Sequence, residues 1–317
     1  MNIPLPVARA LLHPFFRGTF HPRVPWAVQR VLLNATALAQ PLPRGTVVKE
    51  VRLGKRRAER VTSGTVTAPG TVLYLHGGGF TVGSPATHRS LAAHLAQATE
   101  RPVHVLDYRL APEHPCPAAL EDTLEAIEAL TESEGDAASS LVLAGDSAGG
   151  GIALAAAQHL AAGGADRSEG DRGGSHPAPA ALVLISPWAD PGDTAERSRD
   201  LVVSRAWGLA CATAYLGDGD PSDPRYAPAG AGFTGLPPTY LHTNRRELLY
   251  PQCLRLAASL RGAGVETNLV VSDVLWHAAQ AQAGLVSKAA ASVGDIGVFL
   301  TGRWAQQPAG PAAAHGA

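Results

Sequence analysis

The sequence predicts an α/β protein with a mostly parallel central sheet, helices on both faces and a helical cap. Short apolar runs rich in β-branched residues alternate with longer helical runs from about residue 46 onward, which is typical of parallel strands joined by helices. The run that follows Ser147, IALAAAQHLAA, is apolar on nearly every side, as expected of a helix packed centrally on a sheet.

The predicted elements follow one another in this alternation. The expected strands cover residues 46–53, 57–63, 71–76, 103–108, 140–145, 180–185, 238–243 and 267–272. The expected helices cover residues 86–100, 117–132, 148–162, 248–262 and 280–301. Two helical segments, 1–40 and 190–217, interrupt the alternation and together predict a cap above the sheet. We expect one domain over residues 1–304 and a disordered tail over 305–317.

Composition and charge argue against several classes of protein. The 26 Lys and Arg residues balance 27 Asp and Glu residues, and no basic tract indicates nucleic-acid binding. Prolines and Arg9 interrupt the apolar N-terminus, so we expect neither a signal peptide nor a membrane span there. The three cysteines, Cys116, Cys211 and Cys253, are too widely spaced to predict a zinc site or a disulfide framework. A cytoplasmic location is therefore the default, and a homodimer stays open.

One acidic cluster has the appearance of a calcium loop. The segment DGDPSDP begins at Asp218, but its sixth and twelfth positions are Asp223 and Ala229. An EF-hand needs glycine and glutamate at those positions. We therefore expect a proline-rich turn here and no metal site in the chain.

A serine flanked by glycines stands between a predicted strand and a predicted helix, in Gly145-Asp146-Ser147-Ala148-Gly149. A G-x-S-x-G sequence in this context indicates a nucleophile elbow, in which a strained turn exposes the serine hydroxyl. The next helix directs its N-terminal N–H groups toward developing negative charge. A glycine-rich turn at a helix start is the structural alternative, and the strand before and helix after favour the nucleophile.

Three consecutive glycines follow another predicted strand, in the segment HGGGF that starts at His76. Glycines expose backbone N–H groups, which an oxyanion hole needs to stabilise a tetrahedral intermediate. A flexible turn and a phosphate-binding loop are the alternatives. The phosphate loop is disfavoured because no lysine follows at P-loop spacing and no GxGxxG is present.

A third segment, DYRLAPEHPCPAALED over residues 107–122, predicts from its chemistry alone only a structural loop. Together with HGGGF and GDSAGGG, in this order and spacing, it resembles the bacterial hormone-sensitive lipase family of carboxylesterases. The resemblance covers roughly residues 47–300 and implies an α/β-hydrolase fold with a helical cap.

The resemblance also assigns site residues. It places the nucleophile on Ser147 and the oxyanion donors on the backbone N–H groups of Gly78, Gly79 and Ala148. His76 and Asp146 match positions that brace these loops.

The base and the acid should follow the serine in the order acid, then histidine. His277 comes just after the last predicted strand, in a VLWH turn where the family usually has a Gly-Met-Pro-His-like turn. The family's acid falls on Glu247, although Asn244 and Pro251 depart from the family's residues around it.

Two alternatives to this acid stay open. Glu247 could form an ordinary surface ion pair with its neighbour Arg246. Asp190, which follows the preceding strand, could be the acid, although the family uses this position structurally.

The resemblance implies a cofactor-free serine hydrolase that cleaves carboxylic esters through an acyl-enzyme intermediate. The apolar cap segments predict small-to-medium, largely apolar substrates. The unusual acid loop and VLWH turn leave an alternative, a biosynthetic deacylase, lactonising or cyclising enzyme or dehydratase on the same scaffold. A non-catalytic ligand-binding protein is a remote alternative, because the serine, glutamate and histidine are all present.

Overall fold

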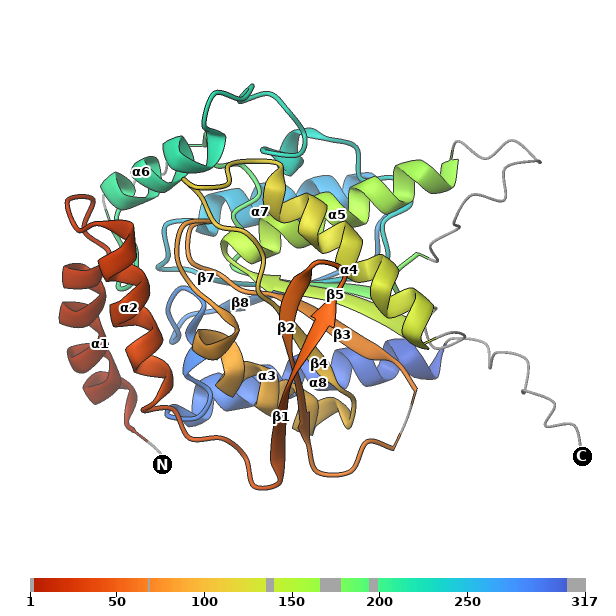
Figure 1. The fold of residues 1–317 in the computed structure, drawn as a ribbon, viewed down its shortest axis with the longest axis horizontal. Coiled ribbons are helices and arrows are strands. Elements are labelled where there is room, and N and C mark those ends of the chain that lie inside the picture. The colour runs from red at the N-terminus through yellow and green to blue at the C-terminus, as the bar shows by residue number, and fades with distance from the viewer. Residues whose placement is uncertain (1–2, 68, 135–139, 166–177, 194–198, 307–317) are drawn as a thin grey trace, which may run out of the picture.

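Eight strands form one sheet in the order β1-β2-β4-β3-β5-β6-β7-β8 (Figure 1). The computed structural model describes residues 3–67, 69–134, 140–165, 178–193 and 199–306. The strands are β1 (Thr46–Leu53), β2 (Arg56–Ser63), β3 (Thr71–Leu75), β4 (Val103–Leu106), β5 (Leu141–Asp146), β6 (Ala181–Ile185), β7 (Thr239–Asn244) and β8 (Thr267–Ser272). Strand β2 runs antiparallel to β1 and β4, and the strands from β4 to β8 are parallel.

The described residues also form eight α-helices. They are α1 (Leu5–Thr19), α2 (Trp26–Ala37), α3 (Pro85–Thr99), α4 (Ala118–Glu134), α5 (Ala148–Ala165), α6 (Arg205–Leu216), α7 (Tyr250–Gly262) and α8 (Ser287–Ala305). Serine side chains cap the N-termini of two of these helices. The Ser84 hydroxyl accepts a hydrogen bond from the Thr87 N–H at the start of α3, and the Ser204 hydroxyl accepts one from the Trp207 N–H at the start of α6.

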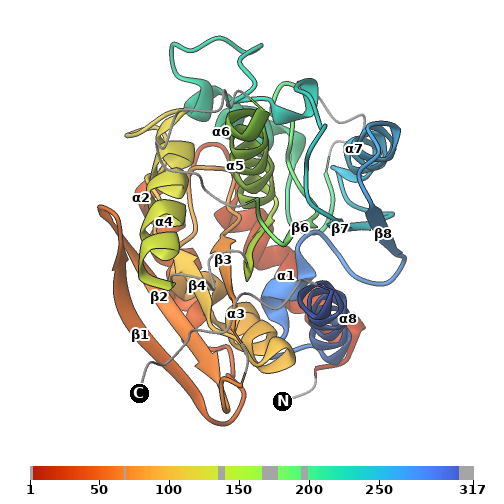
Figure 2. The same ribbon diagram turned by 90° about the vertical axis from the view of Figure 1, so that its right-hand side faces the viewer.

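Alternate positions of the strands face two different helical layers. On one face, strand residues such as Leu73 and Leu143 pack in a cluster with α4, α5 and α7. On the other face, Val72 and Val142 pack with α3 and α8. Figure 2 shows the two layers on opposite sides of the sheet. The predicted mostly parallel sheet with helices on both faces is confirmed.

Helices α1, α2 and α6 lie together at one end of the molecule, within the two segments predicted to form a cap (Figure 1). The Phe20 ring stacks on the Trp207 ring with centroids 4.4 Å apart, and the Trp207 indole N–H donates to the Gln29 side chain at 2.8 Å. Arg30 joins α2 to the sheet domain, donating to the Thr81 and Ala111 carbonyls and forming an ion pair with Glu113.

One predicted helix begins later than expected. Residues Ala279–Gln282 form a short 3₁₀ helix, and α8 starts at Ser287 rather than at residue 280. Gly284 lies between them, where a Cβ atom would sit 2.3 Å from the Pro41 carbonyl oxygen. The chain therefore bends against the N-terminal segment before α8 begins. At the other end of α8, residues 307–317 of the predicted tail lie outside the described part of the chain.

No helix among the described residues is both long enough and apolar enough to cross a membrane.

Candidate active site

Ser147 occupies a strained turn between β5 and α5. Its φ of 50° lies in the left-handed region, which side chains other than glycine rarely adopt. The turn is fixed on both sides, since the Ser147 N–H donates to the Ile185 carbonyl and the Ser147 carbonyl accepts from the Trp188 N–H. Its hydroxyl is thereby lifted above the carboxyl end of the sheet.

The two glycines around Ser147 are required by close backbone contacts. A Cβ atom on Gly145 would lie 2.4 Å from the Gly149 carbonyl oxygen, and one on Gly149 would lie 2.0 Å from the Leu75 carbonyl oxygen. The glycine pattern of the sequence therefore reflects a crossing of strand and helix that leaves no room for side chains.

The HGGGF loop lies beside Ser147 and is also shaped by its glycines. Gly78 and Gly79 have φ values of 128° and 59°. Both line the same cavity as Ser147 and His277. Ala148 is the first residue of α5, where backbone N–H groups have no partner within the helix. The three N–H groups expected to form the oxyanion hole thus belong to segments that meet at Ser147.

Asp146 connects the serine turn to the HGGGF loop. Its buried carboxylate accepts hydrogen bonds from the Gly77 N–H at 3.0 Å and the Tyr74 hydroxyl at 2.9 Å. It also lies 3.2 Å from Nε2 of His88, a residue of α3. Burial alone would raise the pKa of Asp146, but His88 and these hydrogen bonds outweigh it and lower the pKa.

His76 supports the loop as a neutral ring. Burial, reinforced by the neighbouring His88, lowers the pKa of His76 to about 3. The ring stacks on Tyr108 with centroids 4.2 Å apart, and the Tyr108 hydroxyl donates to the His76 carbonyl at 2.6 Å. This contact explains the tyrosine of the DYRLAPEHP segment.

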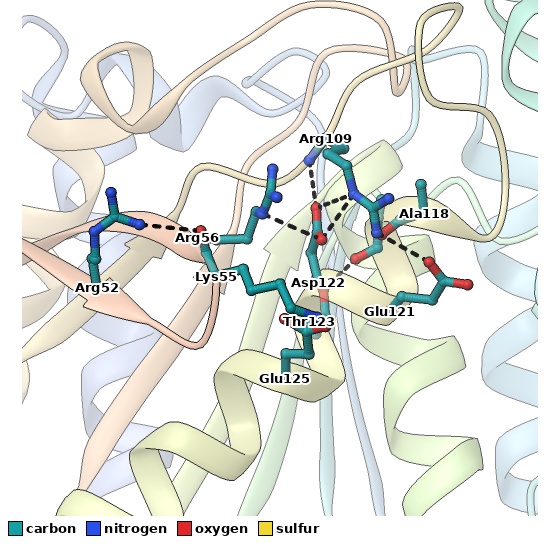
Figure 3. A network of polar contacts seen from close by, with 10 residues as sticks. Arg52, Lys55, Arg56, Arg109, Ala118, Glu121, Asp122, Thr123 and Glu125 are labelled. Atoms are coloured by element: carbon teal, nitrogen blue, oxygen red, sulfur yellow. Dashed lines mark hydrogen bonds and ion pairs between the residues drawn. The ribbon is translucent and has the colours of Figure 1, made fainter.

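Hydrogen bonds and ion pairs join the two ends of the segment 107–122. Figure 3 shows the Asp122 carboxylate accepting from both the backbone N–H and the guanidinium of Arg109, with Arg56 nearby. The Arg109 guanidinium also contacts Glu121 and the Ala118 carbonyl. The ends of the segment are thus tied together, which agrees with the structural role expected from its chemistry.

His277 lies next to Ser147 in the turn that follows β8. The distance from His277 Nε2 to Ser147 Oγ is 2.9 Å, within hydrogen-bond range. The other ring nitrogen, Nδ1, lies 3.4 Å from Glu247 Oε2. This is an ion-pair distance, somewhat longer than the usual N–H···O hydrogen bond of about 2.7–3.2 Å. The structure therefore brings the three predicted residues together in the order serine, histidine, glutamate.

Glu247 is buried, with 1% of its surface exposed. Its two carboxylate oxygens accept hydrogen bonds from the hydroxyls of Ser186 and Thr243, each at 2.7 Å. Burial alone would raise the pKa of Glu247, but His277 and the two hydroxyls outweigh it and lower the pKa. Glu247 is thus held as an anion against the imidazole.

The two alternatives for the acid occupy other positions. The Arg246 side chain is exposed whereas its neighbour Glu247 is buried, so the two point into different surroundings. The Asp190 carboxylate accepts from the N–H groups of Gly192 and Asp193, which is the pattern of a side chain closing its own turn.

Asp200 is a further acidic residue at the site that the sequence pattern does not reveal. One carboxylate oxygen accepts from the N–H groups of Val202 and Val203, at 2.7 and 2.8 Å. The other accepts from the N–H of Leu248, the residue after Glu247, at 2.9 Å. Asp200 therefore ties the cavity wall to the loop that carries Glu247.

Several charges act on His277. Burial lowers the pKa of His277, but Glu247, Asp200 and Asp146 together outweigh it and raise the pKa above its usual value. The site thus favours a positive charge on this imidazole more than water does.

Two cavities meet at Ser147 and His277. The larger has a volume of about 310 Å³, and its apolar walls include Leu12, Phe15, Phe16, Leu33, Val203 and Trp207. The smaller, of about 50 Å³, is bounded by residues that include Trp188, Trp207, Leu248 and Leu249. The hydroxyl of Ser147 is therefore accessible from two apolar spaces of unequal size.

Comparison with known proteins finds α/β-hydrolases and esterases. A family model described as an alpha/beta hydrolase fold matches residues 72–281. An "Acetyl-hydrolase" of Streptomyces hygroscopicus is 37% identical over 212 residues, which are 65% of this chain and 67% of the relative. A "Putative acetyl-hydrolase LipR" of Mycobacterium tuberculosis is 32% identical over 318 residues, 98% of each chain. A solved esterase from the bacterial hormone-sensitive lipase family superposes with a TM-score of 0.84 at 32% identity, covering 93% of this chain and 97% of its own.

Proposed function

Because the chain belongs to the bacterial hormone-sensitive lipase family of α/β-hydrolases, we propose that Ser147, His277 and Glu247 carry out its reaction. The protein is an ester-hydrolysing enzyme of the serine hydrolase class. The contact of 2.9 Å between His277 Nε2 and Ser147 Oγ, on a turn strained to expose that hydroxyl, is the observation that carries the assignment.

In the proposed first step, Ser147 Oγ attacks the ester carbon and His277 Nε2 takes the hydroxyl proton. The N–H groups of Gly78, Gly79 and Ala148 stabilise the negative charge on the carbonyl oxygen. As the tetrahedral intermediate collapses, the C–O bond to the alcohol breaks. His277 then delivers its proton to the departing oxygen, which leaves an acyl-enzyme.

In the second step, His277 takes a proton from water, and the resulting hydroxide attacks the acyl carbon. The acid is released and the proton returns to Ser147. Glu247 holds the imidazole orientation and stabilises its positive charge in both steps. The burial of Glu247 and its two hydroxyl partners support this role, because they keep the carboxylate facing His277.

The larger cavity supports small-to-medium apolar esters as substrates. Its volume of about 310 Å³ is at the lower end of the range for ligand pockets, about 300–1,000 Å³. Its leucine and phenylalanine walls favour apolar groups. Helices α1 and α2 supply most of the leucine and phenylalanine side chains, and α6 supplies Trp207. We propose that the three helices form the cap that covers the substrate.

Esters of p-nitrophenol with acyl chains from acetyl to palmitoyl test this proposal. We expect kcat/KM to rise for the first added methylenes, each contributing about 0.8 kcal/mol when buried, and to fall once the chain outgrows the cavity. Short to medium chains should therefore be preferred over palmitoyl. A preference for palmitoyl would contradict the proposed substrate size. Negligible turnover of every ester, with Ser147 still labelled by a fluorophosphonate, would favour the specialised biosynthetic alternative.

The pH dependence of kcat/KM should report on His277, which must be neutral to accept the serine proton. Since the pKa of His277 is raised, the neutral form is lost at a higher pH than for an ordinary imidazole. We expect activity to fall on acidification through a midpoint above about 6.5. A pH-stat assay over a range of buffers measures this limb.

A variant that removes a charge near His277 tests whether His277 controls the acidic limb. Asp200→Asn removes one negative charge facing His277, so the acidic limb should move to lower pH. Asp193→Asn is the matched control, because the charge of Asp193 is offset by its ion pair with Arg255. An acidic limb that stays in place in Asp200→Asn would show that another group controls it.

The cytoplasmic location and the homodimer stay predictions. Sedimentation velocity on the purified protein measures the oligomeric state.

A further inference from the structure

The outward sides of α1 and α2 are apolar, although they face solvent. In α1, Val7 and Leu11 are 48% and 61% exposed and stand one helical turn apart. In and just after α2, the exposed residues Val28, Val31, Leu32 and Leu38 recur at helical spacing. A solvent-facing helix normally places polar side chains on its outer side. We call these six residues the cap stripe.

The cap stripe is a concentration of exposed apolar side chains rather than a scatter. Among the described residues, seven of the twelve large apolar side chains that are exposed lie between Val7 and Leu42. Leu38 is the most exposed of all, at 91%. Scattered exposed apolar residues are normal, but a concentration on one pair of helices indicates an interaction surface.

The charge of the same segment has one sign. The first 49 residues contain Arg9, Arg17, Arg23, Arg30, Arg44 and Lys49, and they contain no aspartate or glutamate. Arg30 is neutralised by Glu113, but Arg17, Arg23 and Arg44 are exposed. The whole chain has a net charge of −1 from 26 basic and 27 acidic residues, so this segment has a net charge of +6 and the remainder one of −7.

The cap stripe also adjoins the larger cavity. Leu11 is both exposed and part of the cavity wall, and Ala39, the neighbour of Leu38, lines the same cavity. Helices α1 and α2 lie at one end of the molecule, away from the C-terminal end of α8 (Figure 1). A surface that contacts the cap stripe would therefore lie beside the cavity that contains Ser147.

We propose that the cap stripe docks on an anionic lipid surface, with its leucine and valine side chains inserted at the interface and the exposed arginines of the same segment at the lipid headgroups. Apolar side chains flanked by arginine are the features of helices that lie in a membrane interface without crossing it. An anionic lipid surface is favoured over a second copy of this chain, because it complements the positive charge of residues 1–49, which the same segment of a second copy would not. The proposal does not depend on the assignment of the catalytic residues.

Vesicle sedimentation with the full-length protein tests this docking. We expect binding to vesicles of phosphatidylcholine mixed with phosphatidylglycerol, weaker binding to phosphatidylcholine alone, and weakening by added salt. The double variant Val31→Ser/Leu38→Ser should reduce binding to the mixed vesicles by about tenfold. The double variant Arg17→Glu/Arg23→Glu should remove the preference for phosphatidylglycerol.

Matched variants elsewhere serve as controls. Val298→Ser removes a valine that is 76% exposed on α8, and Arg52→Glu reverses an exposed charge on β1. Both should bind vesicles as the unmodified protein does. All four variants should hydrolyse water-soluble p-nitrophenyl acetate normally, since none of these residues lines either cavity, and this shows that they fold.

Three results would overturn the proposal. The unmodified protein could fail to sediment with mixed vesicles, or the cap-stripe variants could bind as well as the controls. In the third result, sedimentation velocity would show that the protein self-associates without lipid and that Val31→Ser/Leu38→Ser abolishes this self-association. The cap stripe would then be a contact between copies of the chain.

Discussion

Replacing Ser147 with alanine is expected to lower ester turnover by about 10⁶-fold. The hydroxyl is the only group that the proposed mechanism bonds to the substrate, and it lies 2.9 Å from His277 Nε2. The backbone turn should survive, because it is fixed by main-chain hydrogen bonds to Ile185 and Trp188 that alanine keeps. The melting temperature should therefore change little while labelling by a fluorophosphonate disappears.

The control for this variant is Ser292→Ala. Ser292 is also buried, but it lies on α8 and bonds to Gln280. It should keep both turnover and labelling. If Ser147→Ala is still labelled or turns over at the rate of the unmodified enzyme, Ser147 is not the nucleophile.

Replacing Glu247 with glutamine should lower kcat by about 10⁴-fold, as amide replacement of the acid does in other serine hydrolases. The amide cannot stabilise the imidazolium and can hold the wrong tautomer of His277. The substitution keeps the size of a side chain that is fully enclosed and bonded to Ser186 and Thr243. A folded, soluble variant is therefore expected, and circular dichroism together with steady-state kinetics checks both points.

Two further substitutions test the alternatives to Glu247 as the catalytic acid. Arg246→Ala should change kcat by less than about tenfold, or 1.4 kcal/mol of barrier, because its side chain is exposed. Asp190→Asn, if folded, should keep most of its activity, because Asp190 closes its own turn. A nearly active Glu247→Gln beside an inactive, folded Asp190→Asn would place the acid after β6 instead.

Much of the fold could be predicted because its signals are local. Buried strands show as short β-branched runs, and the crossing at Gly145 and Gly149 shows as glycines that no other residue can replace. The start of α8 was predicted wrongly, because residues 280–286 have helical composition but bend where Gly284 meets Pro41. That contact joins segments more than 200 residues apart and has no local signature.

The same distinction applies to the site. Ser147 and the glycines of HGGGF stand in motifs whose spacing is visible in the sequence. His88, Ser186 and Asp200 carry no such pattern, since each contributes through a contact with a residue far along the chain. Thr243 bonds to Glu247 only four residues away, but a threonine at the end of a strand has no distinctive pattern either. A serine or an aspartate in a loop is ordinary in sequence, and only the folded arrangement distinguishes these four.

The packing of α1 against the turn that carries His277 limits how this enzyme can diversify. Ala8 shares an apolar cluster with Leu275 and Trp276, and Arg9 donates a hydrogen bond to the Val274 carbonyl. The helix that shapes the substrate cavity is thus also a support of the proposed general base. A recombined or shortened N-terminus would alter substrate preference and the placement of His277 together. Divergence in specificity should therefore proceed by side-chain substitutions within the cap rather than by exchange of the cap as a module.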